Sequence, residues 1–291
     1  NMAVTTEAHV VVPAGAASAT FPVNAGTISS SQTTTITATL GNVVKTTTIE
    51  VTVLASSVLL HINGEPSEVA GTTHGATVNP AFVVPGLTGT VKVLGAGSVS
   101  FTPSQLGSGV SFKKGGQQNG DTAFYSFKGA AVGDVFGLPE GEVTFSIKSN
   151  YSFRNRLLLP RYNYRWVFDV FDNANRLFSF CIGADGGLGF SYQTGGATMQ
   201  YYSVPRGQED ILFGAGVTLH VKLTWNRTSN SLYLNDKLVS TQSYINIAKN
   251  WTANSSFSIG ATDVHLFGGG HFSFDDVLDE FQVRSISANG N

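Results

Sequence analysis

Residues 222–240 read KLTWNRTSNSLYLNDKLVS, and this stretch decides the fold class of the sequence. Apolar and polar residues alternate on both sides of the segment NRTSN, and a third alternating run follows Asn235-Asp236. Alternation with a period of two places one face of a strand in a core and the other in solvent. Asn and Asp also tolerate the positive φ angles of a two-residue hairpin turn. The stretch therefore predicts three consecutive antiparallel strands, with Trp225 in the core, and we interpret it as scaffold.

The composition is that of a β-protein with a sizeable core. The 291 residues are 42% hydrophobic but only 12% charged, and Gly, Ser, Thr and Val are abundant. β-Branched residues fit pleated surfaces, and Gly supplies the conformations that turns need. A net charge of −2 argues against a nucleic-acid partner, because binding to phosphates requires a basic face. No run approaches the roughly 18 apolar residues of a membrane-spanning helix, so we expect no membrane span.

The strand pattern extends over most of the chain. Short apolar or alternating stretches, each bounded by Gly, Asn, Asp or Pro, follow one another after residue 56. They are residues 57–62, 90–95, 98–102, 122–127, 143–149, 165–172, 177–183, 187–193, 199–204, 217–225, 230–235, 237–242, 255–261 and 279–285. No helical periodicity interrupts them. We therefore predict an all-β fold, with a large antiparallel β-sandwich (jelly roll) over residues 58–291.

Residues 1–54 differ from the rest in having Phe21 as their only aromatic residue. Four strand-like runs are readable, at 9–13, 19–23, 33–40 and 43–53. The last two flank Gly41-Asn42, which is a strong hairpin signal. The motifs VPAGAASATFPV, TTTITATLGNVVKT and TTIEVTVL, which begin at residues 12, 33 and 47, resemble the second half of a bacterial immunoglobulin-like repeat.

A complete immunoglobulin-like sandwich needs seven strands and about 100 residues. Residues 1–54 supply only part of that, so we expect a small, partial Ig-like β-unit. Four strands alone bury little apolar surface and leave an unpaired edge. We therefore expect this unit to lean on the larger domain or on another chain, which makes self-association one expected partnership.

Three motifs in the larger domain carry a second resemblance. They are LLHINGEPSEVAG at 59–71, LHVKLTWNRTSNSLYLNDKLV at 219–239 and VLDEFQVRS at 277–285. In this order and at these places they resemble the concanavalin A-like lectin/glucanase superfamily, especially its laminin-G-like branch. The resemblance implies a jelly roll. It does not select a function, because the same fold hosts lectins, hydrolases, adhesins and structural modules.

The sequence lacks the paired-carboxylate pattern that glucanases of this superfamily carry on one strand. Such enzymes place acid and nucleophile on the same face, about 5 Å apart in retaining enzymes. The acidic clusters at 208–210 and 275–280 do not reproduce that spacing. Asp169 and Asp172 are three residues apart and so fall on opposite faces of a strand. A glycan-degrading enzyme is therefore an alternative and not the main prediction.

The resemblance also implies a Ca²⁺ site between the first and last strands, made by a last-strand Asp and backbone carbonyls. Asp279 matches that Asp, and Asn63 stands where the first strand often carries an Asp. Oxygen ligands are those that Ca²⁺ prefers. The alternative is that Asp279 only caps the strand end by hydrogen bonding.

Glycan-binding sites stack aromatic rings on sugar rings and bind hydroxyls with polar groups. Tyr162, Tyr164 and Trp166 recur at period two and share one strand face, with Arg165 on the other. The candidate glycan ligands are Tyr162, Tyr164, Trp166, Arg165, Tyr192, Tyr201 and Tyr202. The alternative is that the first three rings fill the core between the sheets.

We therefore predict a non-catalytic module of a secreted or cell-surface bacterial protein, which binds a glycan or a cell-surface protein in adhesion. A structural subunit of a stalk or filament, with Ig-like strands that complete a neighbouring chain, is the first alternative.

Overall fold

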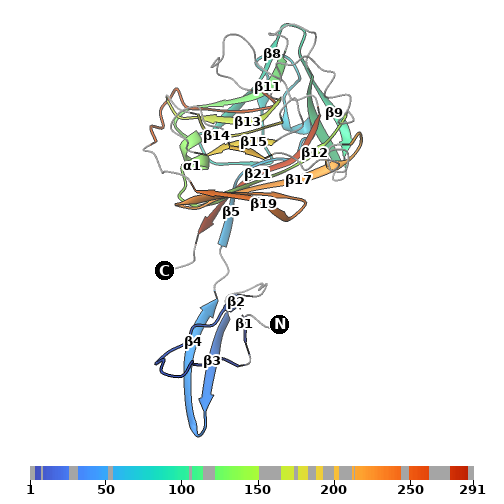
Figure 1. Ribbon diagram of the computed structural model, residues 1–291. Coiled ribbons are helices and arrows are strands. Elements are labelled where there is room, and N and C mark those ends of the chain that lie inside the picture. The colour runs from blue at the N-terminus through green and yellow to red at the C-terminus, as the bar shows by residue number, and fades with distance from the viewer. Residues whose placement is uncertain are drawn as a thin grey trace. The chain divides into compact units, whose positions relative to one another are not determined.

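The computed structural model describes residues 4–7, 9–25, 32–51, 55–104, 107–113, 122–150, 165–173, 176–182, 188–192, 200–202, 212, 214–243, 249–261 and 276–287. The chain divides into two compact units. One consists of Asn1–Ser56 with Ile286–Asn291, and the other of Ser57–Ser285. Figure 1 shows the elements of both units.

The larger unit is a β-sandwich, whose two layers are seen in Figure 1. The first layer has nine described strands, seven of them in the order β19-β18-β17-β12-β21-β10-β9, while β5 pairs with β21 and β7. Their bounds are β5 Ala55–Ile62, β7 Phe82–Val83, β9 Ser98–Ser104, β10 Gly107–Lys113, β12 Gly141–Lys148, β17 Thr218–Trp225, β18 Ser229–Leu234, β19 Lys237–Ser243 and β21 Val277–Ser287.

The second layer has eight described strands in the order β16-β15-β14-β13-β20-β11-β8-β6. Their bounds are β6 Thr77–Val78, β8 Thr88–Leu94, β11 Thr122–Lys128, β13 Arg165–Phe171, β14 Arg176–Ile182, β15 Leu188–Tyr192, β16 Gln200–Tyr202 and β20 Ser256–Ile259. The pairings whose registers are resolved in both sheets are antiparallel, as the sequence predicts.

The opening stretch forms the predicted meander β17-β18-β19. Along β17, Leu219, Val221, Leu223 and Trp225 are buried, while the residues between them are half-buried or exposed. Asn235 and Asp236 connect β18 to β19 with φ angles of 48° and 64°, as the two-residue turn requires. The Trp225 indole Nε1 donates to the carbonyl of Leu138 at 3.0 Å, so its polar atom is satisfied in the core.

Phe281 on β21 links the two layers of the core. Its ring centroid lies 5.8 Å from Phe145 in its own sheet. It also lies 5.5 Å from Phe168 and 5.7 Å from Phe257, which belong to the facing sheet. Aromatic pairs at such distances stabilise a fold by about 0.5–1.5 kcal/mol each beyond the burial of their area. Phe281 is therefore a central contact between the sheets.

A β-bulge interrupts β21 next to Phe281. Thr144 of β12 pairs with Gln282 and Ser146 pairs with Asp279, so one residue of β12 faces two of β21. Glu280 takes up the extra length with a φ of 52°, a conformation that non-glycine residues seldom adopt. Leu278 and Phe281 are both buried in the core. The bulge therefore lets the chain place both intervening acids, Asp279 and Glu280, outside it.

Two short helical segments, which the sequence did not reveal, complete the larger unit. They are a 3-10 turn, η1 (Pro66–Glu68), and α1 (Val132–Phe136). Neither carries the long periodic pattern by which a helix is recognised in a sequence. In the described parts of the chain, no helix has the length and apolar character for crossing a membrane.

Strand β10 was also absent from the sequence prediction. Its sequence, GSGVSFK, is rich in Gly, which lowers strand propensity. The glycines are required by close packing, because a Cβ on Gly109 would overlap the side chain of Val277. Burial of Val110 and Phe112 at alternate positions then holds the strand in the sheet.

The smaller unit contains two separate two-stranded sheets. They are formed by β1 (Val4–Thr6) with β2 (Val23–Ala25), and by β3 (Gln32–Leu40) with β4 (Val43–Val51). The predicted hairpin about Gly41-Asn42 is present, with nine residue pairs from Gln32↔Val51 to Leu40↔Val43. The strand predicted at 9–13 is wrong, because these residues pair with no strand in the part of the chain that the structure describes. Of the strand predicted at 19–23, only Val23 lies in a strand.

Candidate functional site

The outer face of the nine-stranded sheet carries rows of polar side chains. Thr144 on β12 pairs with Lys222 on β17 and with Gln282 on β21. Lys222 in turn pairs with Tyr233 on β18. These outward positions alternate with core residues, so the register that builds the core also aligns the polar row. Four strands thus bring together side chains that are far apart in the sequence.

A second row lies one pair further along the same strands. Ser146 pairs with His220 on β17 and with Asp279 on β21. The Oγ of Ser146 and the Nδ1 of His220 are 2.8 Å apart, within hydrogen-bond distance. The backbone N–H of His220 donates to Asn235 Oδ1 at 3.0 Å, and its carbonyl accepts a hydrogen bond from the Asn235 N–H at 2.8 Å. His220 is therefore held at the end of the hairpin formed by β18 and β19.

An open groove with a volume of about 380 Å³ lies along these two rows. Pockets for small molecules span about 300–1,000 Å³, so the groove lies in the lower part of that range. Its polar lining comes from Thr144, Ser146, His220, Lys222, Asp236, Glu280 and Gln282. The groove therefore presents hydroxyl, amide, imidazole, ammonium and carboxylate groups on one surface.

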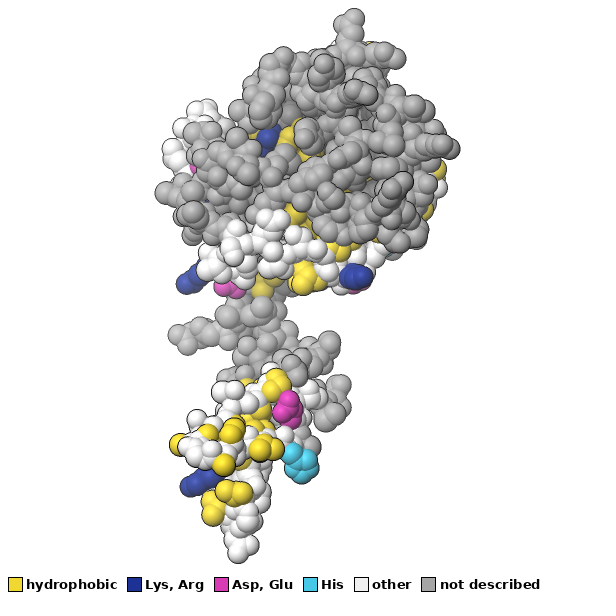
Figure 2. Space-filling view, in the orientation of Figure 1, with side chains coloured by type: hydrophobic (Ala, Val, Ile, Leu, Met, Phe, Trp, Pro, Cys, Tyr) yellow, Lys and Arg dark blue, Asp and Glu magenta, His cyan; other side chains and the backbone are white. Residues whose placement is uncertain are grey.

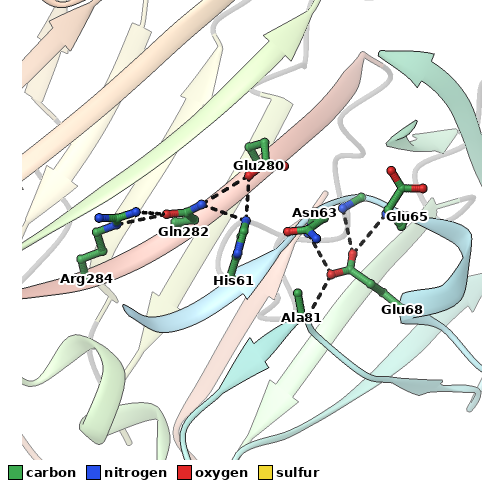
Figure 3. A network of polar contacts seen from close by, with 9 residues as sticks. His61, Asn63, Glu65, Glu68, Ala81, Glu280, Gln282 and Arg284 are labelled. Carbon is green, nitrogen blue, oxygen red and sulfur yellow. Dashed lines mark hydrogen bonds and ion pairs between the residues drawn. The ribbon is translucent and has the colours of Figure 1, made fainter. Parts of the chain in front are cut away.

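One wall of the groove is a chain of hydrogen-bonded side chains from β5 and β21, drawn in Figure 3. His61 Nε2 lies 2.7 Å from Glu280 Oε2 and 2.8 Å from Gln282 Nε2. A ring nitrogen carries at most one proton, so it donates to Glu280 or accepts from Gln282, but not both. Arg284 donates to Gln282 Oε1 from Nε and Nη2, at 3.0 and 2.7 Å. The network fixes the amide of Gln282 and the carboxylate of Glu280.

The end of β5 is held by a buried carboxylate. Glu68 of η1 is 5% exposed and accepts hydrogen bonds from the backbone N–H groups of Asn63, Gly64, Glu65 and Ala81. Burial raises the pKa of Glu68, while these hydrogen bonds oppose the shift. A carboxylate with four donors around it orders the loop after β5 and so fixes the place of the residues there.

Of the predicted Ca²⁺ ligands, Asn63 directly follows β5, and Asp279 lies on β21, the strand with which β5 pairs. A Cβ on Gly64 would lie 3.1 Å from Gly109 Cα, and a Cβ on Gly109 would lie 3.6 Å from Asp279 Cβ. Both Asn63 Oδ1 and Asp279 Oδ1 are buried and lack a hydrogen-bond partner among the described residues. Such orphaned oxygens are costly unless something satisfies them.

The surroundings of Asp279 also disfavour its ionised form. Burial raises the pKa of Asp279, as do the carboxylates of Glu280 and Glu65, whereas a hydrogen bond with Ser104 lowers it. The donors fit a hard cation in type, but Ca²⁺ takes six to eight oxygens. Among the described residues, no group of three or more His, Cys, Asp or Glu is placed to hold a metal ion. Backbone carbonyls or water would have to complete the shell.

The predicted aromatic residues divide by location. Tyr162 and Tyr164 lie outside the described residues. Tyr192 lies on β15, and Tyr201 and Tyr202 lie on its neighbour β16, where the backbone alone is described. The side chain of Arg165, at the start of β13, is likewise outside the description. The strands of Tyr192, Tyr201 and Tyr202 belong to the same sheet as β13 and are separated from it by β14, in the order β13-β14-β15-β16.

Trp166 on β13 is buried, which favours the core alternative over the stacking role. Its ring is only 4% exposed, and the guanidinium of Arg176 lies 4.0 Å from the ring centroid. Arg176 also forms two hydrogen bonds with the buried carboxylate of Asp169, at 2.9 and 2.8 Å. A ring covered in this way has no open face for a sugar. Trp166 therefore packs against the ion pair that Arg176 forms with the buried Asp169.

The groove residues were missed as site residues by the sequence analysis. The signal was present, because Thr, His, Lys and Thr occupy the outward positions 218, 220, 222 and 224 of the strand interpreted as scaffold. What no single strand reveals is which strands become neighbours. The interpretation of this strand as scaffold alone is therefore incomplete, since one of its faces builds the core and the other lines the groove.

Comparisons with known proteins identify the fold but no family. No protein-family model matches the sequence, and no curated protein is detectably similar. A structure of botulinum neurotoxin type C, whose cell entry depends on two ganglioside molecules, matches at 13% identity and a TM-score of 0.53. The binding domain of botulinum neurotoxin DC, in complex with rat synaptotagmin II, matches at 14% and 0.50.

Each neurotoxin match covers 80% of this chain but 49% of the other, so this chain spans about half their length. Domain 4 of AbnA, a GH43 extracellular arabinanase from Geobacillus stearothermophilus in complex with arabinotriose, is 10% identical with a TM-score of 0.48. That match covers 80% of this chain and 95% of the other. At identities this low, the two neurotoxin matches show a shared β-sandwich fold alone.

The positive φ of Glu280 leads to a stability prediction. Glu280→Gly and Glu280→Val both remove the carboxylate, but only valine is strained in the left-handed region. We expect the valine variant to be less stable than the glycine variant by about 1–2 kcal/mol. Urea unfolding followed by tryptophan fluorescence measures this difference, since all three tryptophans lie in the larger unit. Equal stability of the two variants would contradict the bulge geometry.

Proposed function

We propose that the larger unit is a non-catalytic glycan-binding module, and that the groove on its nine-stranded sheet is the binding site. The observation that carries the proposal is the convergence of seven polar side chains from β12, β17, β21 and the β18–β19 turn on one open groove. Sugar hydroxyls both donate and accept hydrogen bonds. A surface that mixes acceptors such as Glu280 and Asp236 with donors such as Lys222 matches them.

A preorganised wall strengthens this interpretation. The amide of Gln282 and the carboxylate of Glu280 are held by Arg284 and His61, so little side-chain entropy is lost when a ligand binds. Two solved structures of similar fold are described as bound to rat synaptotagmin II and as dependent on two ganglioside molecules. Those structures share only the fold with this chain, so the groove and not the likeness carries the proposal.

We further propose that the unit is a laminin-G-like member of the concanavalin A-like superfamily and acts in adhesion outside the cell. The three motifs behind this assignment occupy β5, the β17–β19 meander and β21, which all belong to the nine-stranded sheet. An alignment with homologous sequences tests the superfamily assignment, since the three motifs should then be retained together in the same order.

Binding and its location are tested together by a glycan array followed by calorimetry. Thr144→Arg places a long side chain in the middle of the groove, and we expect it to weaken glycan binding at least tenfold, which is about 1.4 kcal/mol. Thr88→Arg, at an exposed position on the other sheet, is the matched control and should bind as the unmodified protein does.

Two results would contradict the proposal. One is the absence of binding to any glycan, with Ca²⁺ or with a chelator. The other is equal affinity of the Thr144→Arg and Thr88→Arg variants for a bound glycan. Release of reducing sugar from a bound glycan would instead favour the glycan-degrading alternative.

We also propose that Ca²⁺ binds where Asn63 Oδ1 and Asp279 Oδ1 are buried without partners. The ion would satisfy both oxygens and offset the negative charge of Asp279, and so join the end of β5 to β21. It would have a structural role.

Thermal unfolding tests this site. At a Ca²⁺ concentration 100 times Kd, binding adds about 2.7 kcal/mol, and we expect Tm to rise by roughly 5–10 °C. Asp279→Asn keeps the shape of the side chain but removes its charge, and should abolish the rise. Mg²⁺ at the same concentration is the control for general salt effects. A Tm that does not respond to Ca²⁺ would contradict the proposal.

Self-association is a second candidate function, favoured by the surface of the smaller unit. Apolar side chains that are exposed there include Val11 (82%), Leu40 (85%) and Val43 (60%), and Figure 2 shows such side chains gathered on this unit. None of its described residues belongs to the hydrophobic core cluster. Isolated two-stranded sheets are at best marginally stable, so a second copy that covers these side chains would stabilise them.

Light scattering over a concentration series tests this second function. We expect the full chain to form dimers or larger assemblies at high concentration. Val43→Lys combined with Leu40→Lys should shift it to monomer. Leu238→Lys, which changes an exposed apolar residue of the larger unit, is the control. A chain that is monomeric at every concentration would contradict self-association.

A further inference from the structure

Negative charges outnumber positive charges in the lining of the groove. Its lining contains one lysine, Lys222, and two carboxylates, Asp236 and Glu280. With its histidine neutral, the lining therefore has a formal charge of −1. Arg284 and Glu142 stand beside it with opposite charges, 4.0 Å apart, and add no net charge.

The cationic groups at the groove are already engaged within the protein. The Nζ of Lys222 lies 4.5 Å from the centroid of the Tyr233 ring, in a cation–π contact. Arg284 donates hydrogen bonds from Nε and Nη2 to the amide oxygen of Gln282. His61 contacts Glu280, and His220 contacts Ser146. An anionic ligand would therefore meet one ammonium, that of Lys222, against the two carboxylates of Asp236 and Glu280.

The carboxylates, in contrast, keep acceptor atoms for a ligand. All hydrogen bonds of the Glu280 side chain to other described residues use Oε2, which leaves Oε1 open. Asp236 is exposed at the hairpin turn and makes no hydrogen bond or ion pair with any residue that the structure describes. Ionised carboxylates only accept hydrogen bonds, so both residues favour a ligand that has many hydroxyl donors.

From this balance we infer that the groove selects an uncharged oligosaccharide and discriminates against glycans that carry sialic acid, uronic acid or sulfate. The inference rests on the proposed glycan-binding function and adds the chemical class of the ligand. Two carboxylates bind neutral hydroxyls through charge-assisted hydrogen bonds, and the same two repel an anion. The volume of about 380 Å³ suits a short oligosaccharide.

The experiment is a glycan array that carries neutral oligosaccharides beside their sialylated, sulfated and uronic-acid counterparts. Calorimetry then measures matched pairs, lactose with 3′-sialyllactose, and methyl-esterified with free trigalacturonic acid. The second pair has the same rings and linkages, and differs in the methyl esters that remove the negative charges. We expect the neutral member to bind at least tenfold more tightly in each pair that binds, and the ratio to shrink at high salt.

Asp236→Asn is the variant of choice. Asp236 has a φ of 64°, where Asn is well tolerated, so the turn should keep its shape while the groove loses one negative charge. We expect the ratio of neutral to acidic affinity to fall at least threefold. Asp134→Asn, at an exposed position in α1, removes the same charge away from the groove and should leave the ratio unchanged.

The outcomes separate this inference from the function on which it rests. Acidic glycans that bind as tightly as their neutral counterparts, and lose binding with Thr144→Arg, would overturn the inference and keep the groove as the site. An Asp236→Asn variant with an unchanged ratio would also overturn it. Absence of binding to every neutral and acidic glycan would remove the proposed function and the inference together.

Discussion

The position of Phe281 in the core is the constraint on which the arrangement of the larger unit depends. Its ring contacts aromatic rings of both sheets, so the last strand cannot shift without separating the layers. Leu278 must also stay in the core, and two residues instead of one lie between them. A regular strand would turn one of those two residues inward. The bulge at Glu280 resolves the conflict and keeps both acids outside.

The arrangement of polar side chains on the outer face depends on this bulge. The bulge sets the register in which Gln282 stands beside Thr144 and Asp279 beside Ser146. The same strand turns Glu280 toward His61, and the hydrogen bonds of Gln282 and Arg284 extend the wall. Packing inside the sandwich and the polar surface outside it are thus two results of one strand register. A substitution at Glu280 would be expected to affect both.

The sequence allowed much of the fold to be predicted, for identifiable reasons. Alternation in β17 and β18 revealed a half-buried meander, and Asn235-Asp236 revealed its turn. The glycine-rich β10 was missed because its glycines serve backbone contact and carry no periodic signal. The groove was missed because its side chains become neighbours only through strand order. For Trp166 the sequence left two alternatives open, since an aromatic residue at period two is as typical of a core as of a ligand site, and its burial favours the core.

The turn that joins β18 to β19 has one more consequence. It contributes Asp236 to the groove and holds the backbone of His220 through Asn235. A two-residue surface turn thus supplies groups to the groove that the strands themselves do not carry. Substitution of either turn residue would therefore change the charge or the hydrogen bonds of the groove while the core of the sandwich is kept. The chemistry of this face thus depends in part on two residues that belong to no strand.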